Sequence, residues 1–253
     1  MTAATTGTTL DRLLGGRVIL EQPAKGFRAG IDAVLLAASV DAPAAARVLD
    51  AGAGSGAAAL CLARRRPDLA VVGLERDPAT AALGRANAER NEDGGRVAIE
   101  TGDLMAPPAA LVVPFDAVMT NPPFNAPESR AAPSPARAAA TVDTVGPATW
   151  LAACLARLAP KGRLVLIHRA DRLPAVLAAL EPAAGAIEIV PLWPGPGAAA
   201  AAKRVIVRCR KGARGPAILR RGLVLHRATG IFTDAAEAIL RHAASLDDVL
   251  AGN

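Results

Sequence analysis

Short apolar runs alternate along the chain with longer segments in which apolar residues recur at helical spacing. Runs rich in Val, Leu and Ile, bounded by Gly, Pro or charged residues, predict buried strands, and the segments between them predict helices. The predicted strands cover residues 47–51, 70–75, 96–101, 115–120, 163–168, 186–190 and 203–208. The predicted helices cover residues 30–40, 57–66, 78–91, 149–158 and 173–180.

This order of elements predicts an α/β fold. Strands that alternate with helices form βαβ units, which give a parallel sheet with helices on both faces. No helix separates the last two predicted strands, so we expect them to pair as an antiparallel terminal hairpin. The pattern therefore predicts a doubly wound, seven-stranded mixed sheet of the Rossmann-like type.

The chain of 253 residues divides into three parts. We expect an N-terminal segment, residues 1–46, with a helix that covers the ligand site. Residues 47–210 then form the central domain, and residues 211–253 form a basic C-terminal extension packed on the same domain. The longest irregular stretch covers residues 126–146, and loops of that length are usually functional lids or disordered.

Composition limits the class of protein. Hydrophobic residues make up 52% of the chain and aromatic residues only 2%, which predicts a sizeable aliphatic core. The three cysteines form no CxxC pair, so we predict neither a disulfide scaffold nor a metal site. The start of the chain lacks the features of a secretory signal, and the longest nearly uncharged stretch contains four prolines, which a membrane helix tolerates poorly. We therefore expect a cytoplasmic globular protein, either a monomer or a homodimer.

The net charge of +6 is concentrated in one segment. Residues 203–227 hold nine basic side chains and no acidic one, whereas residues 1–202 are neutral. A basic segment attracts phosphate backbones, but Lys and Arg also protect an edge strand against aggregation, and charge alone leaves both interpretations open. The candidate RNA-binding residues in this segment are Lys203, Arg204, Arg208 and Arg210.

A glycine-rich loop joins the first strand of the predicted sheet to its helix. Residues 50–56 read Asp-Ala-Gly-Ala-Gly-Ser-Gly. Glycines permit a sharp turn and a close approach to a ligand, and the helix N-terminus behind them supplies free N–H groups. The GxGxG spacing differs from the GxGxxG of nicotinamide-binding proteins, and the loop lacks the Gly-Lys-Ser/Thr of nucleoside-triphosphate loops. On its own, a plain tight turn fits this loop nearly as well.

Two acidic residues follow later strands. Glu75 ends the second strand, where its carboxylate can accept hydrogen bonds from both hydroxyls of a ribose. Asp103 follows the third strand, where it can accept a hydrogen bond from an adenine amino group. Each acid alone is compatible with a helix cap or a surface charge, but both fall at carboxyl ends of strands, where open parallel sheets bind ligands. Together with the glycine loop, they predict an adenosine-type ligand.

The fourth strand ends in Asn121-Pro122-Pro123-Phe124. The two prolines fix the backbone, so that a side chain and a carbonyl are held rigidly. The Asn121 side-chain oxygen and the Pro122 carbonyl can accept the two N–H protons of an exocyclic amine and stabilise the positive charge that develops on its nitrogen. Phe124 offers a flat face on which a base can stack. The alternative is a rigid turn with a core Phe.

Taken in order, these residues resemble class I S-adenosylmethionine-dependent methyltransferases. Residues 48–56 (VLDAGAGSG), 73–77 (GLERD) and 101–103 (TGD) look like the first three motifs of that family. The resemblance implies S-adenosylmethionine as the cofactor and, through the Asn-Pro-Pro-aromatic turn, methylation of adenine N6, guanine N2 or glutamine N5. The residues that it assigns to the cofactor here are Asp50, Ala51, Gly52, Gly54, Gly56, Glu75, Arg76, Asp103, Leu104 and Asn121.

Segments outside the sheet resemble the bacterial tRNA1(Val) adenine-37 N6-methyltransferases. Residues 26–36 (GFRAGIDAVLL) look like the N-terminal element that packs over the methionine end of the cofactor in that family, which implies cofactor contacts from Gly30 and Asp32. Residues 225–227, 230–233 and 236–241 look like the tail of the same family. The resemblance implies methylation of an adenine N6 in tRNA, beside the anticodon.

Three alternatives to an adenine methyltransferase stay open. The glutamine N5-methyltransferases of release factors carry a separate helical domain before the sheet, whereas only 46 residues precede the first sheet strand here, and a protein substrate does not explain nine cations without an acid. An rRNA guanine N2-methyltransferase shares the same turn. A non-catalytic basic RNA-binding module would have no need to bind S-adenosylmethionine.

Overall fold

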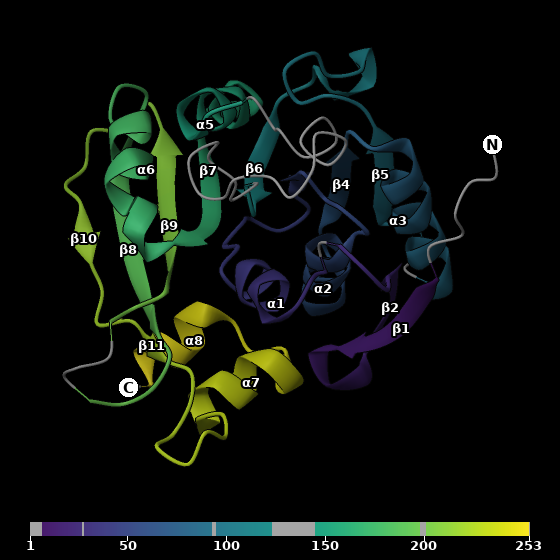
Figure 1. Ribbon diagram of the computed structural model, residues 1–253. Helices are drawn as coiled ribbons and strands as arrows, with labels where there is room; N and C mark the ends of the chain where they lie inside the picture. The colour runs from purple at the N-terminus through teal and green to yellow at the C-terminus, as the bar shows by residue number, and fades with distance from the viewer. Residues whose placement is uncertain (1–6, 27, 93–94, 123–144, 198–200, 253) are drawn as a thin grey trace, which may run out of the picture.

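A mixed β-sheet with helices on both faces forms the centre of the structure (Figure 1). The computed structural model describes residues 7–26, 28–92, 95–122, 145–197 and 201–252. The strands of this sheet are β3 (Arg47–Ala51), β4 (Ala70–Glu75), β5 (Val97–Thr101), β6 (Phe115–Thr120), β7 (Leu158–Arg169), β8 (Ala184–Trp193), β9 (Arg204–Lys211), β10 (Ile218–Leu219) and β11 (Leu223–Val224).

The strand order confirms the predicted doubly wound architecture. It runs β10-β8-β9-β7-β6-β3-β4-β5, and β11 also pairs with β8. Strands β3 to β7 are parallel to one another, while β9 runs antiparallel between β7 and β8, so the predicted terminal hairpin is present. The seven predicted strands are all found. The sheet gains β10 and β11, which sequence periodicity cannot reveal because each has only two residues.

Neighbouring residues on the strands point to opposite faces of the sheet. Val48 and Leu49 of β3, for example, belong to two different apolar clusters. One face packs against α1 (Ile31–Ala38), α2 (Ala57–Arg65), α3 (Pro78–Arg90), α7 (Asp234–His242) and α8 (Leu246–Ala251). The other face packs against α5 (Pro147–Ala156) and α6 (Leu173–Leu180). Short 3₁₀ turns are η1 (Leu14–Gly16), η2 (Ala109–Leu111) and η3 (Ala170–Arg172).

A hairpin that the sequence did not predict lies at the N-terminal end of the chain. Its strands β1 (Thr8–Leu13) and β2 (Val18–Pro23) pair antiparallel and form a separate two-stranded sheet beside α2 and α3 (Figure 1). The burial of β2 alternates, and Val18 and Leu20 pack into the apolar cluster of α1 and α2. β1 is mostly exposed on both sides, so it carries little apolar pattern.

The C-terminal helices α7 and α8 pack onto the same cluster as α1 and α2 through Ile239, Leu240 and Leu246. Thr233 caps α7 by accepting a hydrogen bond from Ala236 N at 3.1 Å. Among the helices that the structure describes, none combines the length and the apolar character required for a membrane span.

Candidate active site

The glycine loop turns sharply from β3 into α2. Its three glycines all have positive φ angles, which a residue with a Cβ adopts only with strain. A Cβ at Gly52 would lie 3.2 Å from the Trp150 ring, whereas a Cβ at Gly54 would meet nothing within 4 Å. Gly52 N donates to Leu74 O at 2.9 Å, which fastens the loop to the end of β4. The φ values are +78° for Gly52, +58° for Gly54 and +87° for Gly56.

Glu75 stands at the end of β4 and faces the same loop. Its Oε2 accepts a hydrogen bond from Gly54 N at 2.9 Å, and its Oε1 accepts one from Asp77 N at 2.9 Å. A carboxylate has about four acceptor positions, so two backbone bonds leave capacity for further donors. The side chain is half-buried and held in a fixed position, which suits it to bind a pair of hydroxyl groups.

Asp50 is a buried acid at the end of β3, with 2% of its surface exposed. Its Oδ2 accepts a hydrogen bond from Ala59 N at 3.1 Å, in the first turn of α2. Burial, and to a lesser degree the charge of Glu75, raises the pKa of Asp50 to about 7 despite that hydrogen bond. A carboxyl group in this state favours a positively charged neighbour, because a cation would stabilise its ionised form.

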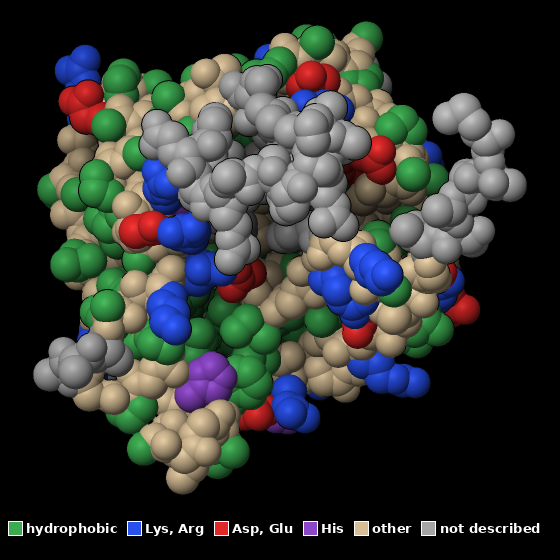
Figure 2. Space-filling view, in the orientation of Figure 1, with side chains coloured by type: hydrophobic (Ala, Val, Ile, Leu, Met, Phe, Trp, Pro, Cys, Tyr) green, Lys and Arg blue, Asp and Glu red, His purple; other side chains and the backbone are tan. Residues whose placement is uncertain are grey.

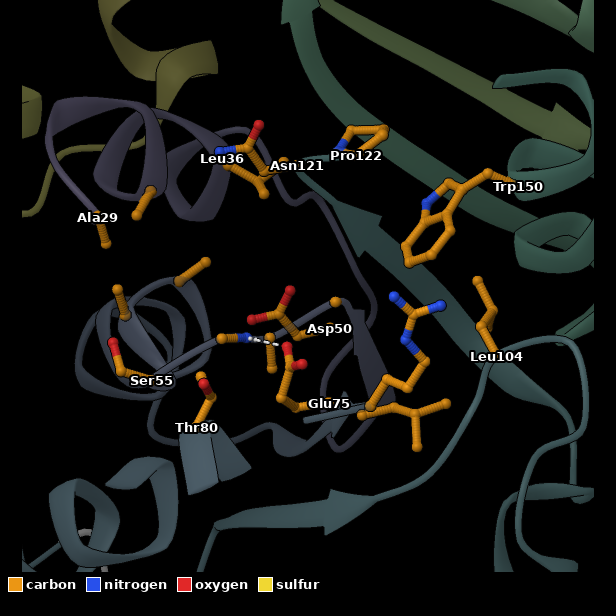
Figure 3. Close-up of a pocket in the computed structure, with 18 of the residues that line it drawn as sticks. Ala29, Leu36, Asp50, Ser55, Glu75, Thr80, Leu104, Asn121, Pro122 and Trp150 are labelled. Carbon is orange, nitrogen blue, oxygen red and sulfur yellow. Dashed lines mark hydrogen bonds between the residues drawn. The ribbon is translucent and has the colours of Figure 1, made fainter. Parts of the chain in front are cut away.

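One cavity of about 480 Å³ opens between these residues and the end of β6 (Figure 3). In Figure 3, Asp50 and Glu75 lie in the middle of the cavity, with Asn121 and Pro122 on one side and Ser55 and Thr80 on the other. Nine of the residues predicted for the site line it: Asp50, Gly52, Gly54, Glu75, Arg76, Asp103, Leu104, Asn121 and Pro122. The glycine loop, the acids at the strand ends and the Asn-Pro turn therefore open into a shared space.

Asn121, which lines this cavity, carries an unusual buried group. Its side-chain oxygen Oδ1 is fully buried and has no hydrogen-bond partner among the described residues. A buried polar atom without a partner costs about 1–3 kcal/mol, so such atoms are rare and call for an explanation. Because Asn121 also lines the cavity, this unpaired acceptor is the group that a donor of a bound molecule could satisfy.

Trp150 is a cavity residue that the sequence analysis missed. Its indole Nε1 donates to Thr120 Oγ1 at 3.0 Å, and that hydroxyl donates to Ala51 O at 2.8 Å. Thr120 directly precedes Asn121, so these bonds fix the Asn-Pro turn relative to the glycine loop. The signal was available, because the chain has only two Trp residues and this one opens the helix after the turn.

The N-terminal segment supplies another wall of the cavity. Pro23 and Lys25 line it after β2, and Ala29, Ala33 and Leu36 line it from α1 and the residues before that helix. The sequence predicts a helix here, with Gly30 and Asp32 as contacts to the cofactor. Neither residue lines the cavity. Asp32 instead forms an ion pair with Arg204 at 3.0 Å.

Of four other predicted residues, two do not line the cavity and two fall outside the described residues. The Ala51 carbonyl accepts the hydrogen bond from Thr120, and Gly56 is the N-cap of α2, so both support the loop without lining the cavity. Pro123 and Phe124 fall outside the described residues, as does most of the irregular stretch at 126–146.

Three of the four candidate RNA-binding cations lie on β9 and the fourth directly precedes it, but they divide between opposite edges of the sheet. Arg204 pairs with Arg169 at the end of β7, on the carboxyl edge where the cavity opens, whereas Arg210 pairs with Arg163 near the start of that strand. Lys203 directly precedes Arg204 and is exposed. Figure 2 shows Lys and Arg side chains, in blue, on the face that includes the start of β9.

Arg208 is held by acidic partners between these two ends. Its Nη1 lies 2.6 Å from Asp247 Oδ1 and 3.3 Å from Glu188 Oε2, and only 12% of its side chain is exposed. Arg208 is therefore largely buried and paired with two acids, whereas Lys203 is exposed.

The free protein should bind a cationic ligand in a pH-dependent way. Because the pKa of Asp50 is about 7, the carboxyl group is protonated at lower pH and gives up that proton when a cation binds beside it. We expect the affinity for S-adenosylhomocysteine, which carries an ammonium group, to level off about one pH unit above the pKa of Asp50 and to fall toward about tenfold per pH unit below it. Calorimetry between pH 5.5 and 8.5 measures this dependence.

The Asp50→Asn variant is the control, since it has no proton to release. Its affinity should be lower at pH 8 and nearly independent of pH over that range. A wild-type affinity that is unchanged between pH 6 and pH 8 would exclude Asp50 from the cation site.

Comparisons with known proteins agree on one family. A sequence model of the methyltransferase small domain matches residues 28–179. A tRNA1(Val) (adenine(37)-N6)-methyltransferase of Porphyromonas gingivalis is 37% identical over 163 residues, which are 61% of this chain and 63% of the relative. A release factor glutamine methyltransferase of Geobacter sulfurreducens is 45% identical over 83 residues, which are 33% of this chain and 28% of that protein. The alignment to the Porphyromonas relative thus covers less than two thirds of its length.

The fold of a solved structure agrees with this family. A predicted O-methyltransferase from Agrobacterium tumefaciens superposes with a TM-score of 0.70 and 27% sequence identity, covering 85% of this chain and 97% of the other. The methyltransferase resemblance of the glycine loop and the strand-end acids is confirmed. The chain belongs to the methyltransferase small domain family.

Proposed function

We propose that this chain transfers a methyl group from S-adenosylmethionine to the exocyclic N6 of an adenine in tRNA. The observation that carries the proposal is the buried oxygen of Asn121, which has no partner among the described residues, in a residue that lines the same cavity as Asp50 and Glu75. The relatives named tRNA1(Val) (adenine(37)-N6)-methyltransferase support tRNA as the substrate and adenine 37, beside the anticodon, as the target. An enzyme with this substrate works in the cytoplasm.

The residues of the cavity fit S-adenosylmethionine. When bound, this cofactor supplies a methyl group on a positively charged sulfur. Glu75 has free acceptor positions for the two hydroxyls of the ribose, and the buried Asp50 carboxylate favours the cationic end. Asp103 keeps acceptor capacity for an adenine amino group, since its Oδ1 accepts one bond from Met105 N at 2.9 Å. The volume of about 480 Å³ falls within the usual range of ligand pockets.

The Asn-Pro turn prepares the nitrogen that accepts the methyl group. The lone pair of an adenine amino group is delocalised into the ring and points away from an in-line attack. Asn121 Oδ1 accepts one N–H of this amine and the Pro122 carbonyl accepts the other, which draws the nitrogen toward a tetrahedral shape and stabilises its developing positive charge. Holding the amine at a fixed place in the cavity adds an orientation effect. No strong base is needed before the attack.

The cations on the carboxyl edge are the proposed contacts to the tRNA backbone. Lys203 and Arg204 lie there, whereas Arg208 and Arg210 lie farther along β9, so we propose the first two as RNA contacts and leave the other two out. Arg172, half-buried in η3 directly after β7, joins them at that edge. Each phosphate contact that is lost reduces the salt dependence of binding by about 0.7–0.9 in the logarithmic slope.

The double variant Arg172→Ala, Lys203→Ala should therefore raise the KM for tRNA several-fold and reduce the salt slope by about 1.5. Methylation rates measured at several salt concentrations give both values. The matched control is Arg210→Ala, Arg214→Ala, which removes the same charge away from the cavity and should change neither value. Equal effects of the two double variants would mean that the edge of the sheet does not define the RNA path.

The proposed reaction is tested by its product. The protein is incubated with labelled S-adenosylmethionine and total RNA, or with a total protein extract, and the RNA is then digested to nucleosides for mass spectrometry. The proposal predicts labelled N6-methyladenosine in tRNA. Labelled N2-methylguanosine would assign the guanine alternative, and label in protein would favour glutamine methylation, a reaction that the partial similarity to the Geobacter release factor methyltransferase keeps as the second candidate.

A further inference from the structure

Asn87 of α3 and Asn91, the C-cap of that helix, bind the free edge of the N-terminal hairpin. Asn87 exchanges two hydrogen bonds with the backbone of Glu21, accepting from its N–H and donating to its carbonyl, both at 2.8 Å. Asn91 does the same with Ile19, at 2.9 Å and 2.8 Å. Each side-chain amide therefore takes the place that a backbone peptide group of a third strand would occupy.

The spacing of the two residues explains why a helix can do this. Residues four apart on a helix are separated by about 6 Å along its axis, and residues two apart on a strand by about 6.8 Å. Asn87 and Asn91 thus match alternate residues of β2 in the antiparallel direction. The hairpin is attached to α3 and its C-cap by four hydrogen bonds from side-chain amides to the backbone of β2, and not by apolar packing alone.

Asn87 makes one contact that Asn91 does not make. Its Nδ2 also donates to Ser55 O at 3.0 Å, in the glycine loop. Ser55 lines the cavity, and the Asn87 side chain is completely buried. With Arg90 Nη1 donating to its Oδ1 at 2.8 Å, Asn87 uses all of its hydrogen-bonding capacity. It is therefore a rigid joint between the hairpin and the loop.

The hairpin in turn carries a wall of the cavity. Pro23, the last residue of β2, and Lys25, two residues later, line the cavity. Gln22, which is 2% exposed, exchanges hydrogen bonds with the backbone of Ala29 at 2.8 Å and 3.1 Å, and Ala29 lines the cavity too. The position of this wall relative to the glycine loop therefore depends on the joint at Asn87.

We propose that Asn87 is a positioning residue, which couples the N-terminal hairpin to the glycine loop and so sets the width of the cofactor cavity. Cofactor binding and the order of the hairpin are then linked in both directions. A ligand in the cavity protects the hairpin from local opening. Conversely, loss of the Asn87 hydrogen bonds lowers the affinity for the ligand. The choice of ligand rests on the proposed function, but the coupling itself does not.

The test compares Asn87→Ala with Asn91→Ala. Both variants remove two hydrogen bonds to β2, but only Asn87→Ala also removes the hydrogen bond to Ser55 O. Hydrogen–deuterium exchange of residues 18–25 and 52–59 is measured with and without S-adenosylhomocysteine, and calorimetry gives its Kd. We expect both variants to speed exchange in the hairpin. Asn87→Ala alone should also speed exchange in the glycine loop and lower the affinity for S-adenosylhomocysteine about tenfold or more. In this variant the ligand should no longer protect the hairpin from exchange.

Asn91→Ala should keep the Kd within about twofold, since the loop stays attached. Asn87→Asp, which preserves the size of the side chain but removes both donor bonds, is the second variant and should behave like Asn87→Ala. The proposal is overturned if the Asn87 and Asn91 variants lower the affinity for S-adenosylhomocysteine equally. It is also overturned if hydrogen exchange in the glycine loop is unchanged in the Asn87 variants. If the wild type fails to bind S-adenosylhomocysteine, the proposed function fails, and the ligand-free exchange of residues 52–59 still decides the coupling.

Discussion

Replacing Asn121 by Ala should lower kcat for methyl transfer about 100- to 1,000-fold, while the affinity for S-adenosylhomocysteine stays within about threefold. The size of the loss follows from the usual effect of removing one polar group that stabilises charge developing in a transition state. Asn121 Oδ1 has no partner among the described residues, so its loss does not break a hydrogen bond that supports that part of the fold. Single-turnover methylation of tRNA measures the rate, and calorimetry measures the affinity.

The variant Asn121→Asp separates the role of the acceptor from the role of the side-chain volume. It keeps an oxygen at the same place, so we expect it to restore at least about tenfold of the activity that Asn121→Ala loses. If the alanine variant loses cofactor affinity and turnover to the same degree, Asn121 serves the cofactor and not the target amine.

Replacing Glu75 by Ala should lower the affinity for S-adenosylhomocysteine about 100-fold. Two hydrogen bonds from ribose hydroxyls to a carboxylate account for a loss of this order, since each bond to a charged group contributes about 1.5–3 kcal/mol. The same change also frees the Gly54 N–H, which Glu75 Oε2 accepts at 2.9 Å, and so loosens the glycine loop. Calorimetry provides the affinity, and a thermal melt establishes that the variant is folded.

Glu100→Ala is the matched control for Glu75. Glu100 is an exposed acid on β5, the strand next to β4, and it does not line the cavity. Its removal changes the net charge by the same amount and should leave the affinity unaltered. An unchanged affinity in Glu75→Ala would remove this carboxylate from the ribose.

The sequence could predict that four site residues lie in one cavity: Asp50, Glu75, Asp103 and Asn121. Each residue follows or ends a buried apolar run, and the carboxyl ends of parallel strands meet at the same edge of a sheet. The buried state of Asp50 could not be predicted in this way, because its raised pKa comes from the helix and the strands packed around it. Pattern locates the backbone of a site residue, but burial depends on the tertiary packing.

The hairpin formed by β1 and β2 gave a weak signal for a physical reason. It is held by side-chain amides at Asn87 and Asn91, which lie more than 60 residues away in the sequence. The apolar alternation of β2 is therefore short: it covers Val18 and Leu20, and the third buried position is the polar residue Gln22. Gly30 and Asp32 were chosen from a resemblance near the correct segment, but the cavity contacts are made by Ala29, Ala33 and Leu36.

The basic segment illustrates a second limit. Arg204 and Arg210 are six residues apart on one strand, which places them about 20 Å apart at opposite edges of the sheet. A count of charges over 25 residues cannot make this distinction. The antiparallel pairing of β9 with β7 distinguishes the two residues. It places the start of β9 at the edge of the sheet where the cavity opens and the end of β9 at the opposite edge.

The central claim is that the methyl donor and the target amine meet in the cavity that contains both the glycine loop and Asn121. A crystal structure of the protein with S-adenosylhomocysteine tests it most directly. The account predicts a ribose on Glu75 and a sulfur that faces the Asn121 side chain. A ligand bound outside this cavity, or a sulfur turned away from Asn121 with that amide occupied by protein atoms, would contradict it.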